Sequence, residues 1–288
     1  MVVLPAPAGP MTPVVDMRVT QFDATMRFDG RSHKRTGKRL ASLDLARLLI
    51  GSAQSRRRGR LIVVQTPGFA TDLSTAAYYE QRAGEYDEWY MGEGLFALRD
   101  RPGWNEEVVQ LVELVGNLPP ARTLDVACGT GFLTQHLHGY VVGIDQSPAM
   151  VAIAQSRLPT GLAVVGDALH LAVADGAFDR VFTGHFYGHL PPAEREAFLS
   201  EARRVADELV VVDSARRPGV DSEQWQERVL NDSSRHRVYK RYLTAEQLAG
   251  ELGGEPLFDG AWFVAARFLV ARNRSSPTSI GRKSHASK

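Results

Sequence analysis

Residues 124–132, LDVACGTGF, decide the fold of this chain. The apolar residues Leu124, Val126 and Ala127 are typical of the end of a buried strand, and the two glycines after them predict a tight turn. A strand that ends in a glycine turn and opens a helix brings backbone N–H groups to one edge of a sheet. The sequence therefore predicts a helix that opens over 132–137 and a ligand site at the carboxyl end of the strand.

The motif resembles the first motif of the class I S-adenosylmethionine (SAM)-dependent methyltransferases, which is an apolar strand, an acid and then x-G-x-G. NAD-binding folds also carry a glycine turn, but Thr134 stands where their fingerprint has its third glycine, which favours SAM. The resemblance implies that residues in and before the turn contact the cofactor, with Asp125 placed to accept from an ammonium group. These residues are Asp125, Ala127, Gly129, Thr130 and Gly131.

Further motifs match downstream: GIDQSPAMVAIAQ, GDAL and FDRVF. In this family the acid that closes the second strand accepts hydrogen bonds from both ribose hydroxyls, which a carboxylate can do. Asp145 holds that position. The resemblance implies that Gln146 and Met150 flank the adenine, while Asp167 accepts from its amino group and Ala168 offers a backbone N–H.

A helix is predicted over 74–91, STAAYYEQRAGEYDEWYM, with Ser74 as its N-cap. The pattern YYxxRAxxYDxWY resembles the N-terminal helix that forms a lid over the cofactor in many small-molecule methyltransferases. Tyr86 matches the tyrosine that lies by the methionine end of the cofactor. Packing of these aromatic residues against the core remains an alternative.

The expected fold is a Rossmann-like doubly wound α/β sheet of seven strands, in the order 3-2-1-4-5-7-6, with strand 7 antiparallel and an N-terminal helical lid. Right-handed crossovers would make residues 123–127 and 179–183 neighbours. Residues 214–241 are interpreted as a helical insertion around 224–230, and Thr244 is expected to cap a helix that ends at Leu252.

Composition predicts a globular domain with extensions. Residues 1–70 are interpreted as a disordered basic extension, 71–271 as the methyltransferase domain, and 272–288 as a disordered basic tail. The single cysteine, Cys128, excludes an internal disulfide framework and is interpreted as a small residue of the turn.

Charge is unevenly distributed along the chain. Residues 1–30 carry −1, 31–60 carry +9 and 272–288 carry +5 of a total of +1, so residues 61–271 carry −12. An acidic domain argues against a nucleic-acid substrate. Without an apolar run of membrane-spanning length or a secretory signal pattern, we expect a cytoplasmic protein with no membrane partner.

The candidate catalytic residues follow the fourth strand, in the segment TGHFYGH. His185 and His189 are candidate general bases, Tyr187 is a candidate orienting hydroxyl, and Thr183 is expected to reach the cofactor. A base is needed only if the nucleophile is protonated. Asp213 is a candidate substrate contact, and no metal site is predicted, because Asp213 alone does not supply a ligand cluster.

Three function classes remain open from the sequence. The first is a SAM-dependent methyltransferase that acts on a small-molecule acceptor by in-line displacement. The second is a nucleic-acid methyltransferase. The amino-methylating members of that class usually have D/N-P-P-Y/F after the fourth strand, and this chain has TGHF there, which argues against this class. The third is a SAM-binding protein without methyl transfer. The sequence leaves the acceptor and the oligomeric state undetermined.

Overall fold

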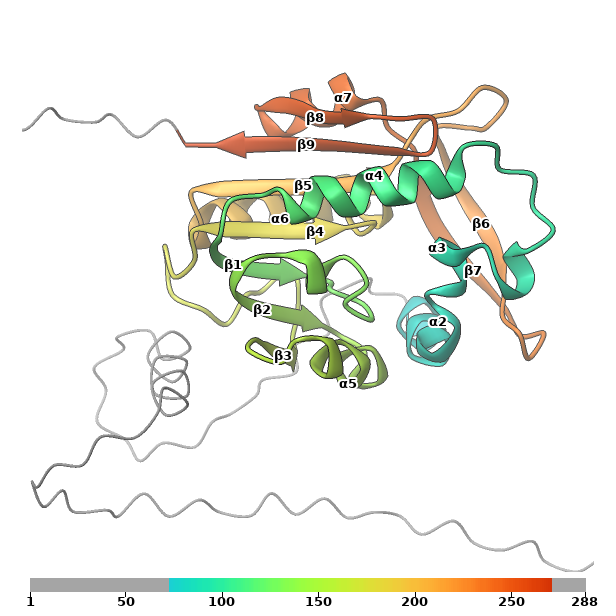
Figure 1. The fold of residues 1–288 in the computed structure, drawn as a ribbon, viewed down its shortest axis with the longest axis horizontal. Coiled ribbons are helices and arrows are strands. Elements are labelled where there is room, and N and C mark those ends of the chain that lie inside the picture. Colours follow the sequence, from blue (N-terminus) through green and yellow to red (C-terminus); the bar gives the residue numbers. More distant parts are fainter. Residues whose placement is uncertain (1–72, 271–288) are drawn as a thin grey trace, which may run out of the picture.

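The computed structural model describes residues 73–270, and its centre is a seven-stranded sheet (Figure 1). The strand order is β3-β2-β1-β4-β5-β9-β8; β9 runs antiparallel to both β5 and β8, and the other neighbouring strands pair in parallel. The strands of this sheet are β1 (Ala121–Val126), β2 (Gly139–Asp145), β3 (Leu162–Val165), β4 (Arg180–Gly184), β5 (Glu208–Ser214), β8 (Glu255–Asp259) and β9 (Phe263–Leu269).

This arrangement confirms the predicted order 3-2-1-4-5-7-6, since β8 and β9 are the sixth and seventh strands of the sheet along the chain. β1 pairs with β4, with Leu124 opposite Val181, so the two segments expected to be neighbours are adjacent. The predicted domain boundaries at 70 and 271, with the basic extension and tail, lie outside the described residues.

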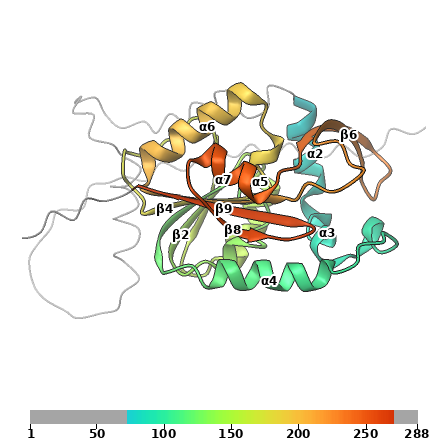
Figure 2. The ribbon, with the colours of Figure 1, turned by 90° about the horizontal axis from the view of Figure 1, so that it is seen from above.

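Helices cover both faces of the sheet, and Figure 2 shows α4 and α6 on opposite sides of it. The α-helices are α2 (Leu73–Arg82), α3 (Glu88–Met91), α4 (Trp104–Gly116), α5 (Pro148–Arg157), α6 (Pro192–Val205) and α7 (Ala245–Leu252). Short 3₁₀ turns are η1 (Ala83–Glu85), η2 (Gly94–Phe96), η3 (Thr134–His136) and η4 (Tyr187–His189).

The apolar run of β5 shows why this sheet is buried on both sides. Leu209 and Val211 belong to the core formed with α6 and α7, whereas Val210 and Val212 belong to the core formed with α4 and α5. Alternate residues of a strand point to opposite faces, so a parallel strand that is covered twice is apolar throughout. The expected cap at Thr244 is present and forms a capping box with Gln247, and Ser147 caps α5 by accepting from the Met150 N–H.

The predicted helix at 132–137 is wrong, because only the 3₁₀ turn η3 follows the glycine turn. β2 begins at Gly139, which leaves room for little more than one helical turn after Gly131. The Thr134 hydroxyl also donates to Asp125 at 2.6 Å, which ties this turn back to β1. In addition, α2 begins at Leu73, so Ser74 lies within the helix and is not its N-cap.

The predicted helical insertion at 224–230 is also wrong. The segment forms a hairpin of β6 (Glu223–Val229) and β7 (Arg235–Arg241), a second sheet of two strands. The exposure of EQWQERV alternates residue by residue, which is the strand period.

Two attached parts lie beyond the carboxyl ends of the parallel strands: the helices α2 and α3, and the β6–β7 hairpin (Figure 1). They contact each other through Tyr78 of α2, Leu230 and Val238. Ligands of open α/β sheets bind at this edge. Among the described residues, no helix combines the length and apolar character needed to cross a membrane.

Candidate functional site

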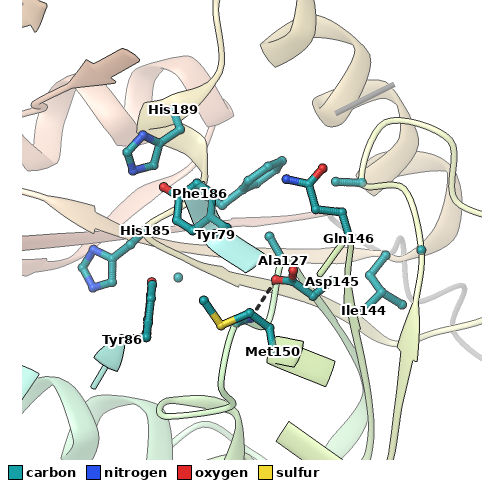
Figure 3. Close-up of a pocket in the computed structure, with 14 residues that line it drawn as sticks. Tyr79, Tyr86, Ala127, Ile144, Asp145, Gln146, Met150, His185, Phe186 and His189 are labelled. Atoms are coloured by element: carbon teal, nitrogen blue, oxygen red, sulfur yellow. Dashed lines mark hydrogen bonds between the residues drawn. The ribbon is translucent and has the colours of Figure 1, made fainter. Parts of the chain in front are cut away.

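A pocket lies at the glycine turn, where β1, β2 and β4 end, and we call it the turn pocket. It is lined by Tyr79, Tyr86, Ala127, Gly129, Ile144, Asp145, Gln146, Met150, Gly166, Ala168, Gly184, His185, Phe186 and His189. Figure 3 shows Asp145 and Gln146 on one side of the pocket and the two histidines on the opposite side. Most of the predicted cofactor residues therefore meet in one place.

Asp145 ends β2 and anchors the turn. Its Oδ2 accepts from the Gly129 N–H and its Oδ1 from the Ser147 N–H, both at 2.9 Å. Burial raises the pKa of this carboxyl to about 6, and the backbone N–H groups oppose that rise. Each carboxylate oxygen has two lone pairs, so each can accept one further hydrogen bond from a ligand in the pocket.

Asp125 lies in an adjoining pocket that shares Tyr86, Ala127 and Gly184 with the turn pocket. It is 1% exposed, and its Oδ2 accepts from Thr134. Its Oδ1 is buried and has no hydrogen-bond partner among the described residues. A buried carboxylate oxygen without a partner is costly unless a ligand donates to it. The position suits a cationic group.

Gln146 supplies a second buried polar atom that lacks a hydrogen-bond partner among the described residues. This atom is the amide Nε2, and the residue lines the turn pocket with Met150 and Ala168. Asp167, the predicted acceptor for the adenine amino group, is not among the residues that line the turn pocket. Its Oδ1 accepts from the Leu169 N–H at 2.8 Å, and its Oδ2 lies 3.0 Å from His170 Nδ1.

Three other predicted contacts have structural partners and do not line the turn pocket. Thr183 donates from its hydroxyl to the Val126 carbonyl at 2.7 Å and so links β4 to β1. Thr130 donates to Asp87 at 2.6 Å. Gly131 adopts φ +77°, and a Cβ there would lie 3.2 Å from Ala154 Cα, so the turn needs glycine to pack on α5.

The lid predicted over 74–91 is a broken helix, and Tyr86 lies between η1 and α3. The Tyr86 ring lines the turn pocket next to Gly129. The Asp87 carboxylate accepts from Thr130 and from Arg157, which fastens this segment to the glycine turn and to α5.

His185 stands where the turn pocket meets a second pocket. It adopts φ +58°, a left-handed conformation that is uncommon outside glycine. Its ring packs against Trp89, Tyr90 and Phe263 at centroid distances of 4.8, 5.6 and 5.4 Å. Neither ring nitrogen has a partner among the described residues, and burial lowers the pKa of His185 to about 3. The imidazole is therefore neutral near pH 7, as a base must be.

This pKa predicts an acid-sensitive stability. The unfolded chain protonates the histidine below about pH 6.5 and the folded chain only near its own pKa, so stability falls as the pH drops between these values. His185→Asn keeps a residue that tolerates the left-handed conformation. We expect urea unfolding at about pH 6 and pH 4.5 to show that the wild type loses more stability than the variant, by about 1.4 kcal/mol per pH unit. Parallel curves would contradict this.

The other two catalytic candidates differ in position: His189 lines both pockets, and Tyr187 lines neither. The Nδ1 of His189 lies 2.6 Å from the Tyr239 carbonyl, which holds the ring in place. The expectation that Tyr187 orients a substrate is not supported by its position. It is 1% exposed, donates to Glu251 at 2.8 Å and packs in the core with Phe198, away from both pockets.

The second pocket, which we call the arginine pocket, has a volume of about 210 Å³. It shares Tyr79, Tyr86, His185 and His189 with the turn pocket. Its remaining lining residues are cationic and aromatic, with one acid and one serine: Tyr78, Arg82, Trp89, Arg99, Asp100, Arg101, Trp104, Ser214, Arg217, Arg228, Lys240, Tyr242 and Trp262. The β6–β7 hairpin supplies two of the cations, and the sequence interpretation missed both because it made this segment helical.

Asp213 lines neither pocket, so the expectation of a substrate contact is wrong. It is 0% exposed at the end of β5, where it accepts from Lys240 Nζ at 2.5 Å and from the Gly188 N–H at 2.6 Å. Burial alone would raise the pKa of Asp213, but Lys240 and His185 lower it below its usual range. Asp213 therefore positions Lys240 and the turn η4. Within the described part of the chain, no group of three metal-ligating side chains comes together.

Comparison with known proteins agrees with this geometry. Residues 124–208 match the family described as a methyltransferase domain. The fold is similar to that of a solved structure titled a DhpI–SAH complex, with a TM-score of 0.53 and 23% identity over 69% of this chain and 97% of that one. The predicted resemblance to methyltransferases is confirmed: residues 124–208 match a methyltransferase domain, and the described residues share the fold of that solved structure.

Two curated relatives illustrate the sequence similarity. Demethylmenaquinone methyltransferase of Thermotoga maritima is 36% identical over 107 residues, which cover 35% of this chain and 44% of that protein. The 2-methyl-6-phytyl-1,4-hydroquinone methyltransferase of Synechocystis sp. is 31% identical over 156 residues, covering 50% of this chain and 48% of that protein. The chain thus spans about half the length of the curated relatives it matches.

Proposed function

We propose that this chain is a SAM-dependent methyltransferase that acts on a small-molecule acceptor. One observation carries the proposal: Asp145 lines the turn pocket, Asp125 lines the pocket that adjoins it at the glycine turn, and the turn pocket shares His185 with the arginine pocket. The relatives named above are methyltransferases by name, and the DhpI structure is a complex with SAH by its title.

The residues fit this cofactor from end to end. Asp125 Oδ1 offers a buried acceptor for the ammonium group, and Asp145 has lone pairs left for a ribose diol. Gln146 Nε2 offers a donor beside the adenine, where Met150 provides an apolar surface. SAM, when bound, supplies an activated methyl group with its own leaving group.

The protein then has to orient the acceptor and exclude water. In-line displacement requires the nucleophile to approach the methyl carbon opposite the sulfur. Among the described residues, those that line both pockets are Tyr79, Tyr86, His185 and His189, so they would flank the path between the two ligands. Both ring nitrogens of neutral His185 lack a partner among the described residues, so one of them can accept a hydrogen bond from an acceptor that carries a proton.

Calorimetric titration with S-adenosylhomocysteine and with NAD tests the cofactor. We expect binding of the first and none of the second. Candidate acceptors incubated with the protein and SAM should then gain the mass of one methylene unit. Failure to bind S-adenosylhomocysteine would refute the proposal, and binding without any methylated product would favour a SAM-binding protein without transfer.

A proton should leave the site when the cofactor binds. Burial raises the pKa of Asp125 to about 8; the Thr134 hydrogen bond opposes this and Asp145 adds to it, so the free protein holds this carboxyl mostly protonated at pH 7. Contact with an ammonium group favours the carboxylate. We expect S-adenosylhomocysteine binding to release about one proton at pH 7 and to tighten as the pH rises from about 6 to 8.

The measurement is calorimetry in buffers of different ionisation enthalpy. Asp125→Asn keeps the shape of the side chain and removes the proton, so the variant should show no buffer dependence. A wild-type binding enthalpy that is equal in all buffers would contradict the role of Asp125.

A further inference from the structure

The arginine pocket gathers cations that have no acidic partner. Arg82, Arg99, Arg101, Arg217 and Arg228 line it, and none of them forms an ion pair with a described residue. Seven other arginines of residues 73–270 do form ion pairs: Arg122, Arg157, Arg180, Arg204, Arg235, Arg241 and Arg267. The fold therefore pairs arginines with acids in many places, whereas none of the five arginines that line this pocket is paired with a described acid, although Asp100 belongs to the same lining.

Three of these side chains converge on one ring. The guanidinium carbons of Arg82, Arg99 and Arg101 lie 5.6, 4.5 and 5.9 Å from the centroid of Phe96. Like charges held this close repel each other. Burial, followed by the positive charges of Arg228 and Arg82, lowers the pKa of Arg99. The cluster costs stability in the protein alone, and an anion in the pocket would reverse that cost.

Arg82 gives the sharpest evidence, because it is buried. The residue is 8% exposed, it donates to the Tyr78 hydroxyl, and its guanidinium carbon lies 5.0 Å from the Tyr86 ring centroid. No described carboxylate neutralises it. Buried charges in proteins are normally paired. The pairing group of Arg82 is therefore expected to come from a ligand.

The opposite wall repeats the combination of cation and aromatic ring. The Arg217 guanidinium carbon lies 4.4 Å from the Trp262 ring centroid and 5.6 Å from that of Tyr242. Lys240 Nζ lies 5.9 Å from the Tyr242 centroid, and Asp213 holds this ammonium group in place. Rings that flank fixed cations suit an organic molecule that has an apolar body and an anionic group.

We propose that the acceptor is a small organic anion, and that the arginine pocket holds its oxyanion group, a carboxylate or a phosphoryl-type group. The planar guanidinium forks of arginine match both groups with paired hydrogen bonds. That this anion is the methyl acceptor depends on the methyl transfer proposed above. The inference also departs from the names of the curated relatives, which specify quinones and hydroquinones.

The test uses the full chain and three probes of similar shape. Benzoate carries a planar anion, phenylphosphonate a tetrahedral one, and benzamide is the neutral match of benzoate. Trp89, Trp104 and Trp262 line the pocket, so tryptophan fluorescence reports binding directly. Each probe is titrated with and without S-adenosylhomocysteine. We expect at least one anion to bind more tightly than benzamide by about tenfold or more, and the comparison of the two anions identifies the oxyanion class.

Variants then assign the effect to the pocket. Arg228→Gln, on β6, should weaken anion binding by about 10- to 150-fold, since a hydrogen bond to a charged group is lost. Arg99→Gln should act in the same direction. Arg237→Gln is the matched control, because it lies exposed on the same hairpin outside the pocket, and it should leave anion binding unchanged. Arg228 is half-buried and Arg99 is exposed, so both variants should fold.

Equal affinity for benzamide and benzoate would overturn the inference, as would anion binding that Arg228→Gln and Arg99→Gln leave intact. Absence of binding by either anion up to about 10 mM would overturn it as well. The proposed function fails separately, through the absence of S-adenosylhomocysteine binding, because the probes are also titrated without that ligand.

Discussion

Asp213→Ala should lower the free energy of unfolding by about 3–5 kcal/mol, the cost of removing one partner of a buried ion pair. The carboxylate is 0% exposed and the Lys240 side chain 3% exposed, so the lysine would remain as an uncompensated buried charge. The Gly188 and Ser214 N–H groups would lose their acceptor as well. Urea unfolding followed by circular dichroism measures the change.

Two further variants separate charge from packing. Asp213→Ala combined with Lys240→Met removes both charges, so it should recover much of the loss. Asp221→Ala replaces an exposed aspartate and should change stability by less than about 0.5 kcal/mol. If Asp213→Ala cost less than about 1 kcal/mol, the pair would not be an essential part of the folded core.

The pair also makes stability depend on pH. Because the pKa of Asp213 is lowered in the folded protein, its contribution is present above the unfolded value and is lost as the pH falls through the folded one. His185 acts in the same direction in acid, since its buried ring stays neutral while the unfolded chain takes up a proton. Both effects predict a fold that is weakened by acid.

Asp145→Ala should weaken S-adenosylhomocysteine binding by roughly 30- to 150-fold, or about 2–3 kcal/mol. The carboxylate would accept from both ribose hydroxyls, and each charge-assisted hydrogen bond contributes about 1.5–3 kcal/mol before desolvation is subtracted. The same substitution removes the acceptor of the Gly129 and Ser147 N–H groups, so the turn itself becomes less rigid.

Isothermal calorimetry gives the affinity, and thermal melting in the absence of ligand shows whether the variant is folded. Asp259→Ala is the matched control, because Asp259 also ends a strand but lies exposed on β8. Its affinity should equal that of the wild type. An Asp145→Ala variant that binds with wild-type affinity would remove this residue from the cofactor site.

The sheet order could be predicted from the chain because its signals are local. A glycine turn, an acid at a strand end and a proline-started helix each depend on neighbours within a few residues. The helix expected after Gly131 does not form, because β2 begins at Gly139 and the segment between them is too short for a helix of several turns. The hairpin was missed because the less exposed positions of 223–229 hold the polar residues Gln224, Gln226 and Arg228, while its apolar residues Trp225 and Val229 are exposed.

The lining of the turn pocket was therefore more predictable than that of the arginine pocket. Asp145, Gln146 and Met150 follow one another on a single strand and helix start. Arg82, Arg99 and Arg228, by contrast, come from a helix, a connection and a hairpin that are distant in sequence. Charge counting could not find them, because the pocket is basic while the domain around it has a negative balance.

The ends of the β6–β7 hairpin are held side by side. Leu243 donates its N–H to the Ser214 carbonyl, and the Arg216 N–H donates to the Leu243 carbonyl at 2.8 Å, around a bridge between Ala215 and Leu243. The excursion from 216 to 242 thus leaves and rejoins the sheet at one point, which makes it a replaceable cassette. Its length and charge can change at modest entropic cost, provided that Lys240, which pairs with Asp213 of β5, and Arg241, which pairs with Glu251 of α7, are kept. Exchanging this cassette would accordingly change the arginine pocket, and with it the acceptor of the proposed methyl transfer, while the turn pocket stays as it is.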